Sequence, residues 1–332
     1  MKKAGDILKE MVAADPEALI RRGISVDSKR LHKRIEGIEL VRAAREAGRQ
    51  EIGFNSRPFV LCGLPIRRPG KEVREYSRVN GRFALRIATN SPLGLPFGQD
   101  RLIPLWVSTL AIRQQNRRVT FSSAAELLRE FGLSTSGFHY KRIVQGFERV
   151  FEATIYFNAD GQRGGAKYID RSRFNFFDQL RLWYLDDNPG LPGDDFQNVI
   201  VLSEQFWQEV QNHPIPVDLG IVRALAHAPG ALDFACWVIW RCWTAKQEQL
   251  IPVFGENGLN LQLGVVDYAR PRRFREQVAK WLDTLRTLWP ECPAKLSGDF
   301  LVIKPGQAIR PLRPRDDNRG VGGLILQDPK VP

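Results

Sequence analysis

Two segments of the chain combine an apolar helical stripe with cationic and amide side chains. They cover residues 136–151 and 271–289. Arg can donate two hydrogen bonds to guanine O6 and N7, and Gln can pair with adenine N6 and N7, so such a helix can read base edges in a major groove. In the second segment the candidate ligands of bases and phosphates are Arg270, Arg272, Arg273, Arg275, Gln277 and Lys280.

The first segment carries a sparser polar set. Its expected apolar stripe is Phe138, Ile143, Val144, Phe147 and Val150, and the corresponding stripe of the second segment is Phe274, Val278, Trp281, Leu282 and Leu285. The candidate DNA ligands of the first segment are Ser134, Ser136, His139, Lys141, Arg142, Gln145 and Arg149. The alternative for both segments is an ordinary solvated helix face. The arginines at the start of the second segment favour DNA contact there, because backbone N–H groups at a helix N-terminus also attract phosphate.

One order of elements occurs twice around these two segments. In the first copy we expect two helices at 99–114 and 123–131, the latter opened by the capping box Ser123–Glu126, with a strand at 118–121 between them. The helix at 136–151 follows, and then two strands, 153–158 and 166–176, flank a Gly-rich turn.

The second copy repeats this order, with Pro at the first turn of its long helix. Its expected elements are a helix at 231–244, a strand at 250–254, helices at 259–266 and 271–289, and strands at 294–297 and 299–304. Helix, strand, helix, helix and a two-stranded wing is the winged-helix order. Wing residues expected to contact phosphates are Arg163 and Lys167 in the first copy and Lys295 and Lys304 in the second.

The sequence therefore predicts an α+β fold with two tandem winged-helix domains, an N-terminal helical, basic extension and a disordered C-terminal tail. We expect the extension at 1–55, the first winged-helix domain at 56–190, the second at 191–305 and the tail at 306–332. Residues 186–195, rich in Asp, Pro and Gly, are expected to link the two domains. Ahead of the first copy, Asn80-Gly81 predicts a β-hairpin.

The helical pattern of residues 28–50 leaves two interpretations open. It is either an amphipathic helix packed on the body or a basic arm or oligomer contact. The cysteines, Cys62, Cys236, Cys242 and Cys292, form no CxxC pair and are expected to be buried free thiols.

The overall charge narrows the class of partner. Lys and Arg number 49 against 37 Asp and Glu, a formal net charge of +12 with a pI near 9.8. Such a surplus favours polyanions, because cations placed on phosphates release condensed counterions. No apolar run reaches the roughly 20 residues that cross a bilayer, and residues 1–20 lack the apolar core of a signal peptide. We expect a cytoplasmic protein without membrane contact.

Motifs for catalysis are missing from the sequence. The four histidines, His32, His139, His213 and His227, form no HxH or HExxH pattern, which argues against a metal-dependent nickase or hydrolase. The loop at 63–72 has the wrong spacing for a phosphate-binding loop and ends in Glu where Ser or Thr would bind magnesium. We expect no metal, no cofactor and no enzymatic activity; a catalytic site assembled from distant residues is the alternative.

Three segments carry a family likeness. Residues 91–106, which contain the run Leu95-Pro96-Phe97-Gly98-Gln99-Asp100-Arg101, resemble the plasmid-encoded RepA replication initiator family, as do residues 121–128 and 147–151. The likeness covers roughly residues 55–300. It implies tandem winged helices, sequence-specific binding to directly repeated origin DNA, promotion of origin opening, and recruitment of the host initiator and replicative helicase. It also implies a homodimer that represses its own gene and a monomer that initiates, with the C-terminal winged helix as the main base reader. A winged-helix transcriptional regulator without initiation activity is the alternative function.

Overall fold

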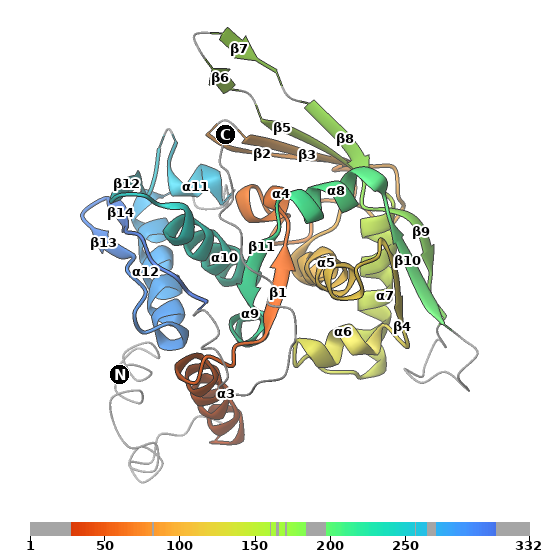
Figure 1. Ribbon diagram of the computed structural model, residues 1–332, viewed down its shortest axis with the longest axis horizontal. Helices are drawn as coiled ribbons and strands as arrows, with labels where there is room; N and C mark the ends of the chain where they lie inside the picture. Colours follow the sequence, from red (N-terminus) through yellow and green to blue (C-terminus); the bar gives the residue numbers. More distant parts are fainter. Residues whose placement is uncertain are drawn as a thin grey trace, which may run out of the picture.

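The computed structural model describes residues 28–309, apart from residues 82, 160, 164–165, 170, 184–196, 256 and 264–269. The first part of the expected N-terminal extension (1–27), the expected linker and nearly all of the expected tail (310–332) lie outside the described residues. The fold is α+β, as the sequence predicts, with helices and small antiparallel sheets alternating along the chain (Figure 1).

The first winged helix is built around α5 (Leu102–Gln114). It continues through β4 (Arg118–Phe121), α6 (Ala125–Glu130) and α7 (Gly137–Phe151). The Trp106 ring of α5 packs edge-on against Phe121 at 4.9 Å and Phe147 at 6.3 Å between ring centroids. These aromatic contacts join β4 and α7 to the buried helix α5, and so fix the direction of α7.

The wing of this unit differs from the prediction. Strand β4 pairs with β10 (Asn198–Leu202), and β10 pairs with β9 (Phe177–Arg181), both antiparallel. The segment expected to link two domains therefore joins neighbouring strands of one sheet, and the predicted boundary between residues 190 and 191 is wrong. The sequence offered no means of choosing this pairing, because β10 is buried and apolar and suits any sheet that can bury it.

The strands expected to form the first wing belong to another sheet. They are β5 (Ala153–Ala159) and β8 (Arg171–Asn175), which pair with each other and extend a hairpin of β2 (Glu75–Asn80) and β3 (Phe83–Thr89). The short pair β6 (Gly161–Arg163) and β7 (Ala166–Tyr168) lies between β5 and β8 in the chain. The predicted hairpin at Asn80-Gly81 is confirmed, and Gly81 has the positive φ of 57° that its turn requires.

The second winged helix follows the prediction closely. Its elements are α10 (Pro229–Thr244), β12 (Gln249–Pro252), α11 (Leu259–Gln262), α12 (Pro271–Leu288), β13 (Lys295–Ser297) and β14 (Phe300–Ile303). The three strands form one sheet in the order β12-β14-β13. Phe274, Val278, Leu282 and Leu285 of the predicted stripe are buried, and Trp281 is half-buried against Phe234 of α10. The end of the helix predicted at 259–266 lies outside the described residues.

Several elements join the two units. Strand β1 (Ile52–Asn55) pairs with β11 (Ile215–Asp218), which leads into α9 (Leu219–Leu225). Helix α4 (Arg57–Leu61) places Phe59 against Phe206 of α8 (Glu204–Asn212). Ser203 caps α8 by accepting a hydrogen bond from the Phe206 backbone N–H. Helix α8 also packs against α5 and β8.

The expected N-terminal extension becomes part of the body from α3 (Ser28–Glu46) onward. Arg42 of α3 donates to the Thr287 carbonyl at the end of α12, at 2.7 Å. Arg45 is buried, pairs with Glu291 at 3.1 Å and lies over the Trp289 ring. The C-terminal half of α3 therefore packs on the body of the protein, as the amphipathic-helix interpretation of residues 28–50 predicts.

The four cysteines are free and buried, as expected. Burial raises the pKa of Cys62 and of Cys236 to about 12, which keeps both thiols protonated and weakly reactive at neutral pH. They serve as small apolar core residues.

Candidate nucleic-acid interface

The cationic start of α12 lies on the surface. Arg270, Arg272, Arg273, Arg275 and Lys280 are exposed, and Gln277 is half-buried. Arg272, Arg273 and Lys280 lie on the side of α12 opposite its buried stripe, while Arg275 and Gln277 flank the stripe. Within the part of the chain that the structure describes, Arg272 alone among these cations has an ion pair, with Glu276 at 3.2 Å. The predicted ligands of the second helix are thus gathered and available to a partner.

The second wing is positioned by the same helix. The Arg275 Nε donates to the carbonyl of Gly298 at 2.8 Å, at the turn between β13 and β14. Gly298 has a φ of 55°, which a residue with a Cβ adopts only with strain. The wing turn therefore lies beside the first half of α12, as a winged helix requires for joint contact with a duplex.

The charge on α12 opposes the helix dipole. No acidic residue lies in its first turn, and arginines occupy the end where backbone N–H groups carry partial positive charge. Helix stability would favour Asp or Glu at these positions. The cationic cluster therefore indicates a polyanionic partner more than a stabilising role.

Helix α7 presents a mixed surface. Ser134, Ser136 and Lys141 are exposed, while His139, Arg142 and Gln145 are half-buried. Ser136 and His139 interact at 2.9 Å near the start of the helix. Burial lowers the pKa of Arg142, and the nearby Asp100 carboxylate opposes that shift. Four predicted polar ligands on α7, together with Ser134 and Ser136 just before it, therefore remain accessible.

Arg149 is a correction to the predicted ligands. Its guanidinium is buried and donates to both carboxylate oxygens of Asp100, at 2.7 and 2.9 Å. Asp100 also accepts from the Phe97 N–H at 3.0 Å. A bidentate, buried pair of this kind holds the end of α7 against the segment before α5. The two guanidinium nitrogens that could bind DNA in a bidentate way are already bonded to Asp100.

Phe138 is a second correction. It was expected in the core stripe of α7, but it is 75% exposed at the second position of the helix. The rest of the predicted stripe, Ile143, Val144, Phe147 and Val150, is buried. Phe138 lies three and four residues from Lys141 and Arg142, so it shares their side of the helix.

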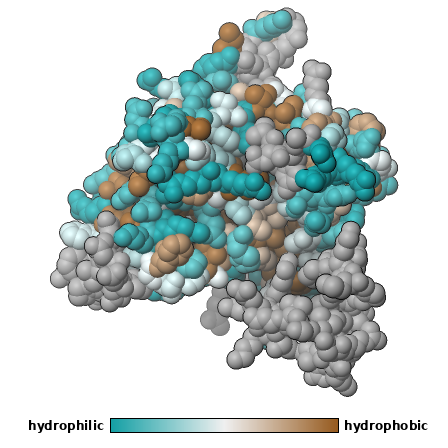
Figure 2. All heavy atoms as spheres, turned by 180° about the vertical axis from the view of Figure 1, so that it is seen from behind, coloured by the Kyte–Doolittle hydropathy of each residue, from teal (hydrophilic) through white to brown (hydrophobic). Residues whose placement is uncertain are grey.

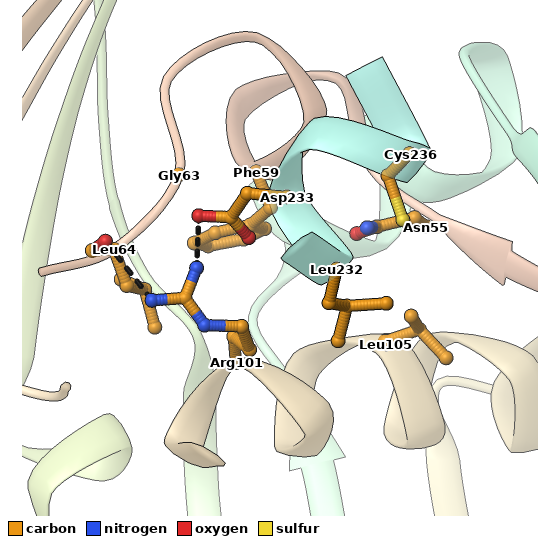
Figure 3. Close-up of a pocket in the computed structure, with 9 residues that line it drawn as sticks. All are labelled: Asn55, Phe59, Gly63, Leu64, Arg101, Leu105, Leu232, Asp233 and Cys236. Carbon is orange, nitrogen blue, oxygen red and sulfur yellow. Dashed lines mark hydrogen bonds and ion pairs between the residues drawn. The ribbon is translucent and has the colours of Figure 1, made fainter. Parts of the chain in front are cut away.

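Sequence reasoning missed the role of Arg101. Its guanidinium forms an ion pair with Asp233 of α10 and donates to the Leu64 carbonyl at 3.1 Å, as Figure 3 shows. It also donates to the carbonyls of Pro65 and Gly98. Burial raises the pKa of Asp233, and Arg101 opposes this shift. Two residues that are adjacent in the chain thus make two different connections. Asp100 holds the end of α7 within the first unit, and Arg101 connects the first unit to α10 of the second.

The basic residues predicted on the two wings differ in availability, and those of the first predicted wing lie on the separate β6–β7 pair. Lys167 and Lys295 are exposed. Lys304 pairs with Glu248 at 3.0 Å, which partly neutralises it. Arg163 lies on β6, and its side chain is outside the described part of the structure.

The two candidate reading helices lie on opposite flanks of the molecule, with α5 and α10 between them (Figure 1). Seen from behind, the described surface is mainly hydrophilic with scattered apolar groups (Figure 2). Over the described ranges, no three His, Cys, Asp or Glu side chains gather in a metal-binding group. The helices within those ranges are all too short or too polar to cross a membrane.

The model of a family described as plasmid encoded RepA protein matches residues 112–251. This match confirms the resemblance that the sequence indicates, and it spans α7, strands β5, β8 and β10, and α10. Among curated proteins, none matches the chain.

Two crystal structures are similar at low identity, and both contain domains 2 and 3 of RctB. The first, a selenomethionine derivative, has 13% identity and a TM-score of 0.43, covering 74% of this chain and 88% of that one. The second has 13% identity and a TM-score of 0.44, covering 72% and 84%.

Proposed function

We propose that this chain, whose residues 112–251 match plasmid-encoded RepA proteins, is a replication initiator that binds repeated origin DNA. The observation that carries the proposal is the exposed cationic cluster on α12 beside the wing turn at Gly298. Arg273 and Gln277 lie one helical turn apart and would reach neighbouring bases in a major groove. The remaining cations would neutralise flanking phosphates.

Helix α7 would form a second, weaker reading head. Its Lys141, Arg142 and Gln145 supply two cations and one amide, against five candidate cations and one amide on α12 and its N-cap. Because the buried pairs of Asp100 and Arg101 connect both units, the spacing of the two heads would be set by the folded body and not by a flexible linker. Directly repeated DNA sites at a fixed spacing suit such a pair of heads.

The further roles that follow for a RepA-type protein are part of the proposal. They are opening of the origin, recruitment of the host initiator and replicative helicase, repression of its own gene as a homodimer, and action in the cytoplasm. The protein would act without catalysis. Incubation with supercoiled plasmid and divalent metal is expected to leave the plasmid uncut, and metal-dependent nicking would favour the alternative of a dispersed active site.

A transformation assay tests the initiator role directly. The gene with its flanking DNA, placed on a fragment that carries only a selectable marker, is expected to yield replicating circles. The matched control carries Arg273→Ala with Gln277→Ala and is expected to give none. If the wild-type protein binds the flanking DNA but the wild-type fragment does not replicate, the protein is instead a winged-helix transcriptional regulator.

A further inference from the structure

The four-stranded sheet has an outer face that neither winged helix uses. Its inner face is buried, with Leu85, Ile87 and Ile155 in the core. On the outer face the described residues are exposed or half-buried, and in Figure 1 helices α4 and α8 lie on the other side of the sheet. The outer side chains, read across the strands, are Glu75, Ser77, Val79, Ala84, Arg86, Ala88, Thr154, Tyr156, Asn158, Arg171, Arg173 and Asn175.

One row of this face joins an aromatic ring to two arginines. Arg86 on β3 lies opposite Tyr156 on β5, which in turn lies opposite Arg173 on β8. Side chains directly across neighbouring strands are about 5 Å apart, so the three form a continuous band. The Arg86 guanidinium lies over the Tyr156 ring, 3.9 Å from its centroid. The result is a flat cationic stack at a solvent-facing surface.

Among the residues that the structure describes, the charge of this face is positive on balance. Arg171 lies beside Asn158 in the next row, which brings the arginines of the face to three, Arg86, Arg171 and Arg173. The facing carboxylates are Glu75, which pairs with Arg86 at 3.1 Å where both are about half exposed, and Asp178, which Arg117 holds at 3.1 Å. Both ion pairs are solvent-exposed and therefore weak, so neither keeps a stronger anion from the face.

The face also has a hollow of suitable size. Tyr156, Arg173 and Asn175 line a depression of about 420 Å³ together with Thr154, Asp178 and Ser203. A single nucleotide fits such a volume, and its base can stack on a ring or on a guanidinium plane while its phosphate meets an arginine. A duplex does not offer a free base for such stacking, because its base faces are already stacked on one another.

We propose that the outer face of this sheet binds single-stranded DNA. The stack of Arg86 on Tyr156 receives a base, and Arg171 and Arg173 hold the adjacent phosphates. The assignment rests on the proposed role in origin opening, which leaves unpaired strands next to the bound duplex. The duplex would then be held by α12 and one released strand by the sheet.

The test measures both activities in the full chain. Binding of a fluorescently labelled oligothymidine of about 20 nucleotides measures the activity of the sheet. Binding of a labelled duplex from the flanking DNA measures the activity of α12. Tyr156→Ala with Arg173→Ala is expected to weaken oligothymidine binding roughly tenfold or more and to leave duplex binding within about twofold. Arg273→Ala is expected to do the reverse, so failure of the sheet proposal is distinguishable from failure of the proposed function.

Two matched variants control the chemistry of the face. Tyr156→Phe keeps the ring and is expected to bind oligothymidine as the wild type does. Glu75→Gln removes the carboxylate that competes for Arg86 and is expected to strengthen binding. Equal oligothymidine affinity for the wild type and the Tyr156→Ala, Arg173→Ala variant, with matching urea midpoints, would overturn the proposal. The proposal would also be overturned if the Tyr156→Ala, Arg173→Ala variant had a different molecular mass in solution from the wild type but bound oligothymidine equally well. The face would then be a contact between copies of the chain.

Discussion

Arg149→Ala is expected to lower the free energy of unfolding by about 3–5 kcal/mol, because it leaves the Asp100 carboxylate buried without its cation. The side chains of both residues are almost fully buried, so water cannot replace the lost donors. The backbone N–H of Phe97 is the one donor to Asp100 that the described contacts retain. Urea denaturation followed by tryptophan fluorescence would measure the change.

Two controls separate this structural role from DNA contact. Arg142→Ala, two turns earlier on the same helix and half-buried, is expected to cost about 1 kcal/mol or less. Arg149→Met with Asp100→Leu, which removes both charges and keeps the volume, is expected to recover much of the loss. An Arg149→Ala protein with wild-type stability and a shallower salt dependence of DNA binding would restore Arg149 as a phosphate ligand.

Arg273→Ala with Gln277→Ala is expected to remove the preference of the protein for its own repeats while leaving nonspecific binding. Each bidentate base contact contributes about 1–3 kcal/mol of discrimination, so the preference should fall roughly a hundredfold or more. The cations at Arg270, Arg272 and Arg275 would continue to attract phosphate. A competition assay with specific and scrambled duplexes measures the ratio.

The matched control removes the same two side-chain types elsewhere. Arg113→Ala with Gln114→Ala changes exposed residues at the end of α5 that are not among the candidate DNA ligands. This variant is expected to keep the wild-type preference. If the Arg273→Ala, Gln277→Ala protein also keeps it, α12 does not read bases, and the specific contacts must come from α7 or the wings.

Turn and capping residues in the sequence correctly predicted the elements whose bounds depend on nearby residues. The Asn80-Gly81 turn determined the β2–β3 hairpin, and Pro271 and Pro290 bracketed α12. The order of elements in the second winged helix was predicted from local patterns, although β12 pairs with β14 from about 50 residues further along the chain. The cationic cluster of α12 needs no tertiary information, since it follows from helical spacing alone.

The sequence could not predict the pairing of the sheets or the burial of Arg149, because both depend on contacts between distant segments of the chain. The alternation of β5 and β8 suits any two-sided sheet, so it could not show that β4 pairs with β10. Arg149 looked like a surface cation because its partner, Asp100, lies 49 residues earlier in the chain. The exposure of Phe138 could have been predicted from the sequence. This residue lies about 140° around the helix from Ile143, well away from the buried stripe.

The most direct test of base reading is the anisotropy of two labelled duplexes titrated with wild-type protein at several salt concentrations. One duplex comes from the DNA flanking the gene, and the other is a scrambled sequence of equal composition. We expect the natural duplex to keep an advantage of roughly a thousandfold or more as salt rises, because base contacts do not depend on counterion release. If both duplexes weaken together with one slope, the net charge of +12 alone accounts for binding, and the two helices do not read DNA.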